Sequence, residues 1–254
     1  MAKIIAIANQ KGGVGKTTTA VNLSACLAFL GKKVLIIDND PQGNTSSGLG
    51  VDKNSIEKSI YDVLINDISI EDTYIKTPVE GLLISPSNIQ LAGAEVELVS
   101  IISRETRMKT ALSDINKNFD FIIIDCPPSL GLLTINSLTA ANTILVPIQC
   151  EYYALEGLSQ LMNTVKIVKR HLNKELEVEG VVLTMFDART NLSIEVVEEV
   201  KKYFGNKVYR SIIPRNVRLS EAPSYGLPII LYDSKSRGAE SYMNLSKEVI
   251  LNHN

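Results

Sequence analysis

A glycine-rich stretch near the start of the chain carries lysines and threonines in a spacing that suits phosphate chemistry. The segment NQKGGVGKTTT spans residues 9–19 and lies between a short apolar run and a segment of helical character. Its glycines allow a tight turn that aims backbone N–H groups inward, and a helix N-terminus adds to this anion site. Lys16 can reach the β- and γ-phosphates of a nucleotide, and the Thr17 hydroxyl can bind Mg²⁺. An accidental glycine-rich turn is the alternative, but GKT at a strand–helix junction favours a phosphate-binding loop.

The loop departs from the usual pattern G-x-x-x-x-G-K-[ST]. Gln10 stands where that pattern has its first glycine, and a second lysine, Lys11, precedes the glycines. A lysine so early in the loop cannot easily fold back onto the phosphates of its own subunit, but it can reach a nucleotide bound by a second copy. Phosphoryl transfer needs positive charge on the γ-phosphate oxygens, which an arginine finger supplies elsewhere. Lys11 of a second copy can supply that charge.

Carboxylates follow two apolar runs. FIIID ends in Asp125, at the carboxyl end of an expected strand, which is where open α/β sheets bind ligands. This is a Walker B pattern in which Asp125 holds Mg²⁺ directly or through water; a helix N-cap is the weaker alternative, given the two prolines that follow. The run VLIID leads into DNDPQGN, which supplies Asp38 and Asp40, and one of them can orient a water for attack on the γ-phosphate. Together with Thr17, Asp38 and Asp125 make up the predicted metal site.

The elements that must position these residues alternate along the chain. Short β-branched runs predict strands buried on both faces, as in a parallel sheet; they cover 3–8, 34–38, 121–126, 143–148 and 178–186. Helical patterns cover 17–32, 57–66, 91–117, 154–173 and 191–205, with glycine at the end of the first and last, Gly31 and Gly205. The segment 154–173 places Leu155, Leu158 and Leu161 on one stripe.

This alternation predicts an α/β fold with a doubly wound, mostly parallel sheet flanked by helices, of the P-loop NTPase type. Residues 44–118 are less regular, with a weaker strand signal at 81–85. No linker, repeat or low-complexity tract interrupts the chain, so we expect one domain over residues 1–254.

Composition excludes several classes of protein. The chain has 254 residues, 45% hydrophobic and 21% charged, with no apolar run near the roughly 18 residues that span a bilayer. The N-terminus does not read as a signal peptide, which indicates a cytosolic protein. Three scattered cysteines and two distant histidines give neither a disulfide framework nor a zinc pattern. The cysteines are expected to be buried thiols.

Charge is unevenly distributed although the net charge is only −2. Between Lys166 and Arg218 there are 11 Lys and Arg against 7 Asp and Glu, which leaves +4 there and −6 elsewhere. Such lopsidedness bears on the choice of partner. By itself it is also typical of a solvated helix face with mixed charges.

The motifs resemble the deviant Walker A group of P-loop ATPases. KGGVGKTT, DNDPQGN and FIIIDCPPSLG carry this resemblance. Further segments extend it over nearly the whole chain to the ParA/Soj chromosome-partitioning ATPases: IQLAGAEVEL, PIQCEYYALEGLSQL, LTMFDARTNLS, IPRNVRLSEAPS and SRGAESY. Other members of the group fit less well. An iron protein needs paired cysteines at its dimer face, a MinD-like protein a basic amphipathic tail helix, and a tyrosine-kinase relative a Tyr-rich tail.

The resemblance implies a set of site residues. The nucleotide-binding residues are Lys11, Gly12, Gly13, Val14, Gly15, Lys16, Thr17, Thr18, Pro214 and Asn216, with Pro214 and Asn216 bordering the adenine. Lys11 and Gly12 lie at the dimer interface, and Lys11, Lys16 and Asp40 are catalytic, Asp40 by positioning water. Arg189 and Arg218 resemble the arginines that bind DNA in the dimer. Read without the family, both are ordinary loop or helix-start arginines.

The function implied is that of an ATPase with ATP and Mg²⁺ as cofactors. ATP forms a sandwich homodimer that binds double-stranded DNA without sequence preference, and hydrolysis releases it. A ParB-type centromere-binding protein stimulates hydrolysis, the replication initiator is a further candidate partner, and the protein is expected in the cytoplasm on the nucleoid. The first strand begins at about Lys3, which leaves no room for the N-terminal helix-turn-helix domain of larger ParA proteins.

Two rival functions use the same loop. A MinD-like ATPase would associate with membranes, whereas the end of this chain, RGAESYMNLSKEVILNHN, has few basic residues and reads as a helix docked on the domain without a stable membrane anchor. A metabolic P-loop enzyme would phosphorylate or ligate a small molecule and would need an acceptor pocket, for which residues 44–118 give no sign.

Overall fold

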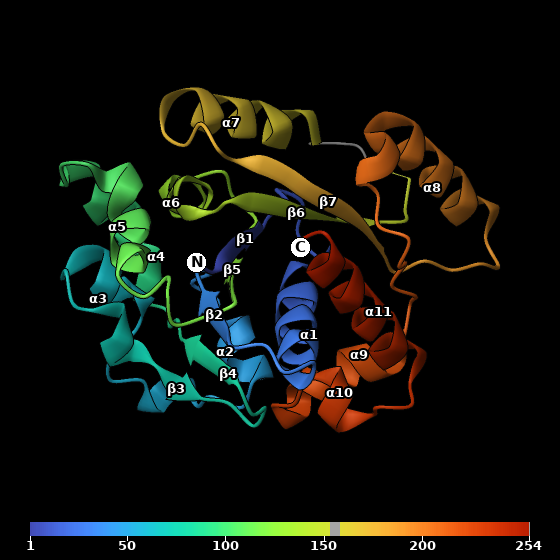
Figure 1. Cartoon of the computed structure of the whole chain (residues 1–254), viewed down its shortest axis with the longest axis horizontal. Helices are drawn as coiled ribbons and strands as arrows, with labels where there is room; N and C mark the ends of the chain where they lie inside the picture. The colour runs from blue at the N-terminus through green and yellow to red at the C-terminus, as the bar shows by residue number, and fades with distance from the viewer. Residues whose placement is uncertain (153–157, 254) are drawn as a thin grey trace.

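A central sheet organises the chain in the computed structural model, which describes residues 1–152 and 158–253 (Figure 1). Within these residues seven strands form one sheet in the order β3-β4-β2-β5-β1-β6-β7. All neighbours pair in parallel except β3 and β4, which are antiparallel. The strands are β1 (Lys3–Ile7), β2 (Val34–Asp38), β3 (Ile75–Lys76), β4 (Leu82–Ser85), β5 (Phe121–Asp125), β6 (Thr143–Gln149) and β7 (Glu177–Thr184).

Helices cover both faces of this sheet, so its strands are buried on both sides, as their apolar runs predict. One face packs against α3 (Ile60–Ile65), α4 (Leu91–Glu97), α5 (Arg107–Ser113), α6 (Leu132–Ala140), α7 (Leu158–His171) and α8 (Asn191–Phe204). The other face packs against α1 (Lys16–Phe29), α9 (Val217–Glu221), α10 (Ile229–Tyr232) and α11 (Arg237–Leu251). The short α2 (Asn44–Gly48) follows β2. This doubly wound α/β arrangement confirms the predicted fold class.

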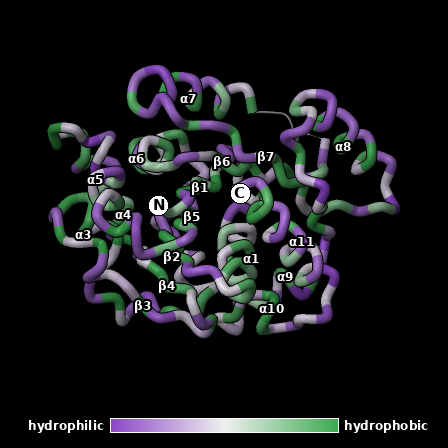
Figure 2. The backbone as a smooth tube through the Cα atoms, viewed as in Figure 1, coloured by the Kyte–Doolittle hydropathy of each residue, from purple (hydrophilic) through white to green (hydrophobic). Residues whose placement is uncertain are grey.

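The predicted strands and long helices are present, with ends within a few residues of expectation. Gly31 adopts a left-handed φ of 81° just after α1, and Gly205 follows α8 directly, as their helix-stop positions predict. The apolar stripe of α7 is buried and includes Leu158 and Leu161. Figure 2 shows hydrophilic and hydrophobic residues together along α7. Leu155, predicted on the same stripe, lies outside the described residues.

Residues 91–117 are less helical than predicted. Helix α4 gives way to 3₁₀ turns at Leu98–Ser100 and Arg104–Thr106, and helix α5 ends at Ser113. Ser103 has a φ of +57°, in the left-handed region that interrupts a right-handed helix. The edge strand β3 and the helices α6, α9 and α10 were not predicted, because their apolar runs are too short to show a period.

The C-terminal helix α11 lies beside α1 (Figure 1). The hydroxyl of Ser236 caps its first turn, and Tyr242, Leu245 and Val249 are buried. The predicted docked tail helix is therefore confirmed, and its apolar side is not available to a membrane. Among the described residues, no helix combines the length and apolar character needed to cross a bilayer.

Candidate nucleotide site

The phosphate loop lies between β1 and α1 and is held in place from two other strands. Asn9 Nδ2 donates a hydrogen bond to Pro147 O of β6 (2.8 Å), and Thr184 Oγ1 at the end of β7 donates to Val14 O (2.9 Å). Gly13 and Gly15 adopt φ values of 74° and 87°, which favour glycine strongly. The loop is therefore preorganised by the carboxyl ends of neighbouring parallel strands.

Lys16 is the first residue of α1 and is buried at 7% exposure. Its Nζ donates to Lys11 O (3.1 Å), so the ammonium lies back across the loop. Burial lowers the pKa of Lys16, and the nearby carboxylate of Asp125 opposes that shift. A cation held at a helix N-terminus inside a glycine nest is suited to bind phosphate oxygens.

Lys11 and Gly12 form the outer rim of the loop. The backbone N–H of Lys11 donates to Asn9 Oδ1 (3.0 Å), whereas its ammonium has no hydrogen-bond or ion-pair partner among the residues that the structure describes. Gly12 is exposed, and no described atom outside its chain neighbours lies within 4 Å of a Cβ built there. The rim is thus open to a second molecule.

Asp125 and Asp38 are register partners on β5 and β2, so both carboxylates project at the same edge of the sheet. Asp125 Oδ2 accepts hydrogen bonds from Thr17 Oγ1 (2.8 Å) and Thr45 Oγ1 (2.7 Å). Asp125 Oδ1 is buried and has no hydrogen-bond partner in the described part of the chain. Burial, together with the charge of Asp38, raises the pKa of Asp125 to about 7.

This arrangement fits Mg²⁺, which prefers oxygen ligands. Asp125 offers an unpaired, buried carboxylate oxygen, and Thr17 offers the hydroxyl next to it. Asp38 is more fully engaged, because its Oδ2 accepts from Ser46 N (2.8 Å) and Ser46 Oγ (2.7 Å) and its Oδ1 from Asp40 N (3.3 Å). Burial raises the pKa of Asp38 to about 6. The expected role of Asp38 in metal binding stays a prediction.

Asp40 lies at the same edge, 7% exposed. Its Oδ1 accepts a hydrogen bond from Gln42 N (2.9 Å), and its Oδ2 forms no hydrogen bond with a described residue. One carboxylate oxygen is therefore oriented by the turn of DNDPQGN, and the other is free to accept from water.

A cavity of about 590 Å³ opens beside the loop. Gly15 and Thr18 line it on the loop side, and Pro214 and Asn216 line it on the other. Its volume lies in the range of small-molecule sites. The structure therefore brings the two predicted adenine-bordering residues to the phosphate loop from 200 positions away in sequence.

Several residues of the site escaped the sequence prediction. Thr45 and Ser46 of α2 bind the carboxylates of Asp125 and Asp38, and Thr184 anchors the loop. Thr184 ends a predicted strand, a position that could have identified it, since ligand sites in such sheets gather at the carboxyl ends of strands. Met185, which lines the cavity with a φ of 53°, gave no signal.

Arg189 and Arg218 lie outside this cavity and are exposed, with 85% and 55% of their side chains accessible. The guanidinium of Arg189 pairs with Asp187 (2.6 Å), and that of Arg218 with Glu221 (2.9 Å) and Asp233 (3.5 Å). They are therefore surface residues, apart from the nucleotide site.

Comparison with known proteins places this site in a family. Residues 2–178 match the family model described as AAA domain. The chain is 65% identical to the sporulation initiation inhibitor protein Soj of Bacillus subtilis over 252 residues, covering 99% of this chain and 100% of Soj. It is 55% identical to the chromosome partitioning protein ParA of Myxococcus xanthus over 248 residues, covering 98% of this chain and 88% of that one.

Among solved structures, cobyrinic acid a,c-diamide synthase from Mycobacterium smegmatis with bound ADP and magnesium is similar at 38% identity. Its TM-score is 0.88, and the match covers 100% of this chain and 95% of that one. The extent and level of identity to Soj and ParA confirm the resemblance seen in the motifs. The chain belongs to the Soj/ParA family of chromosome-partitioning ATPases and is a P-loop ATPase.

Proposed function

We propose that this protein binds Mg²⁺ and ATP, dimerises around the nucleotide, and in that state binds double-stranded DNA without sequence preference. ATP hydrolysis then dissociates the dimer and releases the DNA. The protein acts in chromosome or plasmid partitioning with a ParB-type partner that stimulates hydrolysis. The relative named for chromosome partitioning, ParA of Myxococcus xanthus, supports this assignment.

The observation that carries the proposal is the open rim of the phosphate loop. The Lys11 ammonium lacks a partner among the described residues, whereas Lys16, five positions later, already supplies the loop's own buried cation. A second lysine is therefore free for a nucleotide held by another copy. Exposed Gly12 allows two backbones to approach closely at this point.

Each of the other residues of the site has a separate role in phosphoryl transfer. Lys16 and the loop N–H groups bind the phosphates, and Pro214 and Asn216 border the base. Thr17 and Asp125 hold Mg²⁺, which neutralises phosphate charge when bound. Asp40 accepts a hydrogen bond from water through its free oxygen and orients it for attack. A partner's Lys11 completes the positive charge around the γ-phosphate.

DNA binding is assigned to the exposed Arg189 and Arg218. Arg189 pairs with Asp187, and Arg218 with Glu221 and Asp233, at the surface, where water screens such ion pairs and weakens them. The arginines can therefore exchange these partners for DNA phosphates at little cost. Phosphate contacts carry no sequence information, which accounts for non-specific binding.

Light scattering with ATP and Mg²⁺ tests the proposal. The wild-type protein should double its mass from 27.8 kDa, and a generic duplex should bind only then with high affinity. Lys11→Gln should bind nucleotide but stay monomeric, because its loop keeps Lys16. If Lys11→Gln dimerises with ATP as the wild type does, the role of Lys11 across the dimer is refuted.

The metabolic alternative rests on the similarity to the Mycobacterium smegmatis synthase. The higher identity to Soj and ParA, over nearly the full chain, favours partitioning. ATP turnover should rise with DNA and a ParB-type protein and not with cobyrinic acid and an amide donor. The replication initiator is a further proposed partner, to be tested by pull-down in both nucleotide states.

A further inference from the structure

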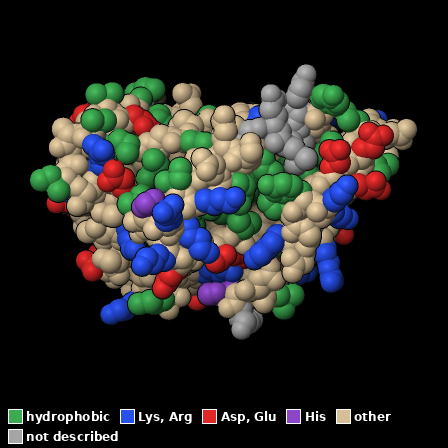
Figure 3. Space-filling model, turned by 90° about the horizontal axis from the view of Figure 1, so that it is seen from above, with side chains coloured by type: hydrophobic (Ala, Val, Ile, Leu, Met, Phe, Trp, Pro, Cys, Tyr) green, Lys and Arg blue, Asp and Glu red, His purple; other side chains and the backbone are tan. Residues whose placement is uncertain are grey.

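Most of the positive charge between residues 166 and 218 lies away from Arg189 and Arg218. Lys and Arg side chains gather instead where β7 begins, at the amino edge of the sheet, on the side of the molecule that Figure 3 shows. We call this group the amino-edge basic face. Its members are Lys169, Arg170, Lys201, Lys202, Lys207 and Arg210.

Contacts join the three parts of this face. Lys169 at the end of α7 pairs with Glu177, the first residue of β7. Lys207, in a 3₁₀ turn after α8, donates to Val178 O of the same strand (2.9 Å). Lys207 and Arg210 line one cavity of about 360 Å³. Lys201 and Lys202 lie in the last turn of α8, directly before that 3₁₀ turn.

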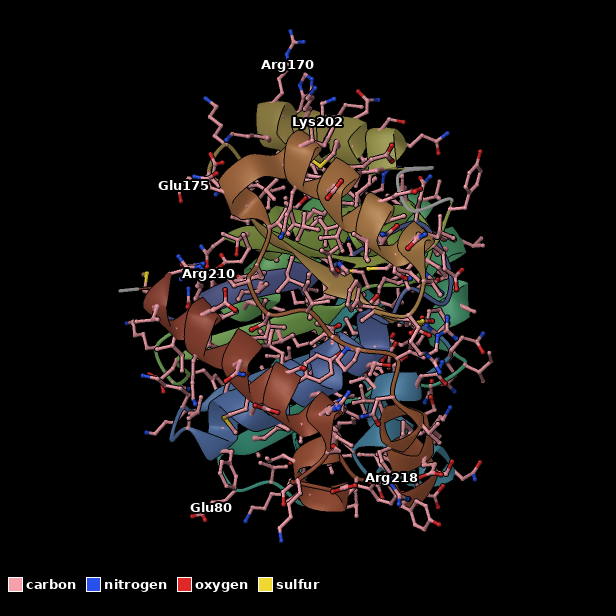
Figure 4. All side chains as sticks on the ribbon, turned by 90° about the vertical axis from the view of Figure 1, so that its right-hand side faces the viewer. Glu80, Arg170, Glu175, Lys202, Arg210 and Arg218 are labelled. Carbon is pink, nitrogen blue, oxygen red and sulfur yellow. The ribbon has the colours of Figure 1, made fainter. Side chains whose placement is uncertain are left out.

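The charge of this face shifts the pKa of a neighbouring carboxylate. The hydrogen bond from Lys169 lowers the pKa of Glu177, and the charge of Lys207 adds to the effect. His253, close to this edge, has its pKa lowered by burial and then by the charge of Lys3, with Lys32 and the N-terminal ammonium adding to it and Glu179 opposing it. Glu177 is thus already paired. The other acids beside the face are Glu175 (Figure 4), the exposed Glu198 and Glu199 of α8, and Glu248, which accepts a hydrogen bond from Arg210 N (2.9 Å) and lines the same cavity as Lys207 and Arg210.

The face is far from the nucleotide. Strand β7, eight residues long, spans about 25 Å from Glu177 at this edge to Thr184 at the phosphate loop. Figure 4 shows Arg170 and Lys202 at the top of the molecule, Arg210 lower down on its left side, and Arg218 at the lower right. A contact with the amino-edge basic face is therefore separate from one with Arg218.

We propose that the amino-edge basic face is a second binding surface for the phosphate backbone of duplex DNA. The inference rests on the proposed function, in which DNA is the polyanion that this protein meets. If two copies join at their phosphate loops, their amino edges point away from each other, so one duplex cannot reach both faces directly across the dimer. Each face then holds its own duplex, and the dimer bridges two DNA segments.

An anionic membrane is another polyanionic surface, but helix α7 is not suited to lie on one. A helix that lies on a membrane inserts an apolar face between lipids. The apolar stripe of α7, including Leu161, Val165 and Val168, is already buried against the sheet. What α7 presents outward is largely polar and charged (Figure 2). Phosphate contacts alone, without insertion, are how proteins bind duplex DNA non-specifically.

The test uses Arg170→Gln combined with Lys202→Gln. Neither side chain has a hydrogen-bond or ion-pair partner among the described residues, so the double variant should fold as the wild type does. The matched control is Lys58→Gln with Lys76→Gln, which removes the same charge beside β3, at the other end of the sheet. None of the four residues belongs to the nucleotide site.

The first measurement is duplex binding by nucleotide-free protein against salt concentration. If both residues contact phosphates, the slope of log K against log salt should fall in magnitude by about 2 in the Arg170/Lys202 variant and stay unchanged in the control. In the second, protein with a non-hydrolysable ATP analogue is held on an immobilised duplex and offered a second, labelled one. The wild type and the control should capture it, and the variant should lose most of this capture.

Equal slopes and equal capture in variant and control would overturn the inference. So would loss of flotation with anionic vesicles in the Arg170/Lys202 variant while duplex binding is unchanged, which would identify the face as a membrane surface. If the wild type binds no duplex in any nucleotide state, the proposed function fails with it. If only the Arg189→Ala/Arg218→Ala variant changes duplex binding, the proposed function stands and the second surface does not.

Discussion

Gly12 offers a way to separate dimerisation from folding. A Cβ built at Gly12 meets no described atom beyond its chain neighbours within 4 Å, and its φ is not in the left-handed region. Within one chain, the Cβ of Gly12→Val therefore meets no neighbour, and no positive φ strains the new residue. Its two methyl groups project from the rim where the partner's backbone is proposed to approach.

The change in monomer stability and the loss of dimer affinity caused by Gly12→Val can each be estimated. Replacing a glycine at a compatible backbone angle stabilises a protein by about 0.4–1 kcal/mol through the unfolded state. For a chain of this size that raises the melting temperature by about 1–4 °C. Forcing extra methyl groups into a packed contact costs about 1–3 kcal/mol. A two-fold dimer repeats that cost, so the dimer should weaken by about thirtyfold or more.

Thermal denaturation and sedimentation with ATP and Mg²⁺ measure these two quantities. We expect Gly12→Val to melt at or slightly above the wild-type temperature, to bind ATP, and to sediment as a monomer. Gly13→Val is the contrasting variant, because a φ of 74° should cost about 1–2 kcal/mol and lower the melting temperature. A Gly12→Val protein that dimerises with wild-type affinity would refute the close approach of two loops.

The other predictions concern single groups of the site. Lys16→Ala should abolish binding of a fluorescent ATP analogue, because the buried cation of the loop is lost; binding within tenfold of wild type would contradict its role. Asp40→Ala should bind ATP, hydrolyse it at least about tenfold more slowly and accumulate as a dimer; a monomer at saturating ATP would contradict the switch. Asp125 has a folded pKa of about 7 against 3.8 in the unfolded chain, so the folded state binds the extra proton between these values. The free energy of unfolding without Mg²⁺ should then fall as pH rises from about 4 to 7. Asp38, with a pKa raised to about 6, contributes a fall of the same sign below pH 6, so Asp125→Asn should make the fall shallower in denaturant titrations, most clearly between about pH 6 and 7. An equally steep fall between about pH 6 and 7 in Asp125→Asn would assign it to another group.

Local sequence was enough to predict the core of the fold because the signals there are local. A strand buried on both faces must be apolar at nearly every position, so a run such as FIIID can be recognised as a strand from the sequence alone. The loop that follows β1 needs glycine at fixed positions, and Gly13 and Gly15 are found with positive φ. Residues at the ends of such strands, Asp38 and Asp125, could be expected to meet.

Weaker elements could not be predicted, since their stability comes from contacts rather than from a pattern. Helix α6 follows two prolines and a glycine, and its first N–H groups are satisfied by Glu95 of α4, which accepts from Leu132 N (2.9 Å) and Leu133 N (3.3 Å). Strand β3 has two residues and exists through its pairing with β4. The helix is interrupted at Ser103 because this residue has a positive φ, which a serine in the sequence does not predict.

The sequence by itself determined the phosphate loop, its second lysine, the carboxylates at the ends of strands and the alternation that makes a parallel sheet. Each is a matter of residue type at a fixed spacing. Only the tertiary structure decided which distant groups that the sequence had not indicated share the site: Thr45 on Asp125 and Thr184 on the loop. It also brought Lys169 of α7 and Lys207 of the 3₁₀ turn after α8 to the start of β7. Spacing along the chain determines which chemistry residues close in sequence can perform together. The order of strands in the sheet determines which residues far apart in sequence become neighbours in space.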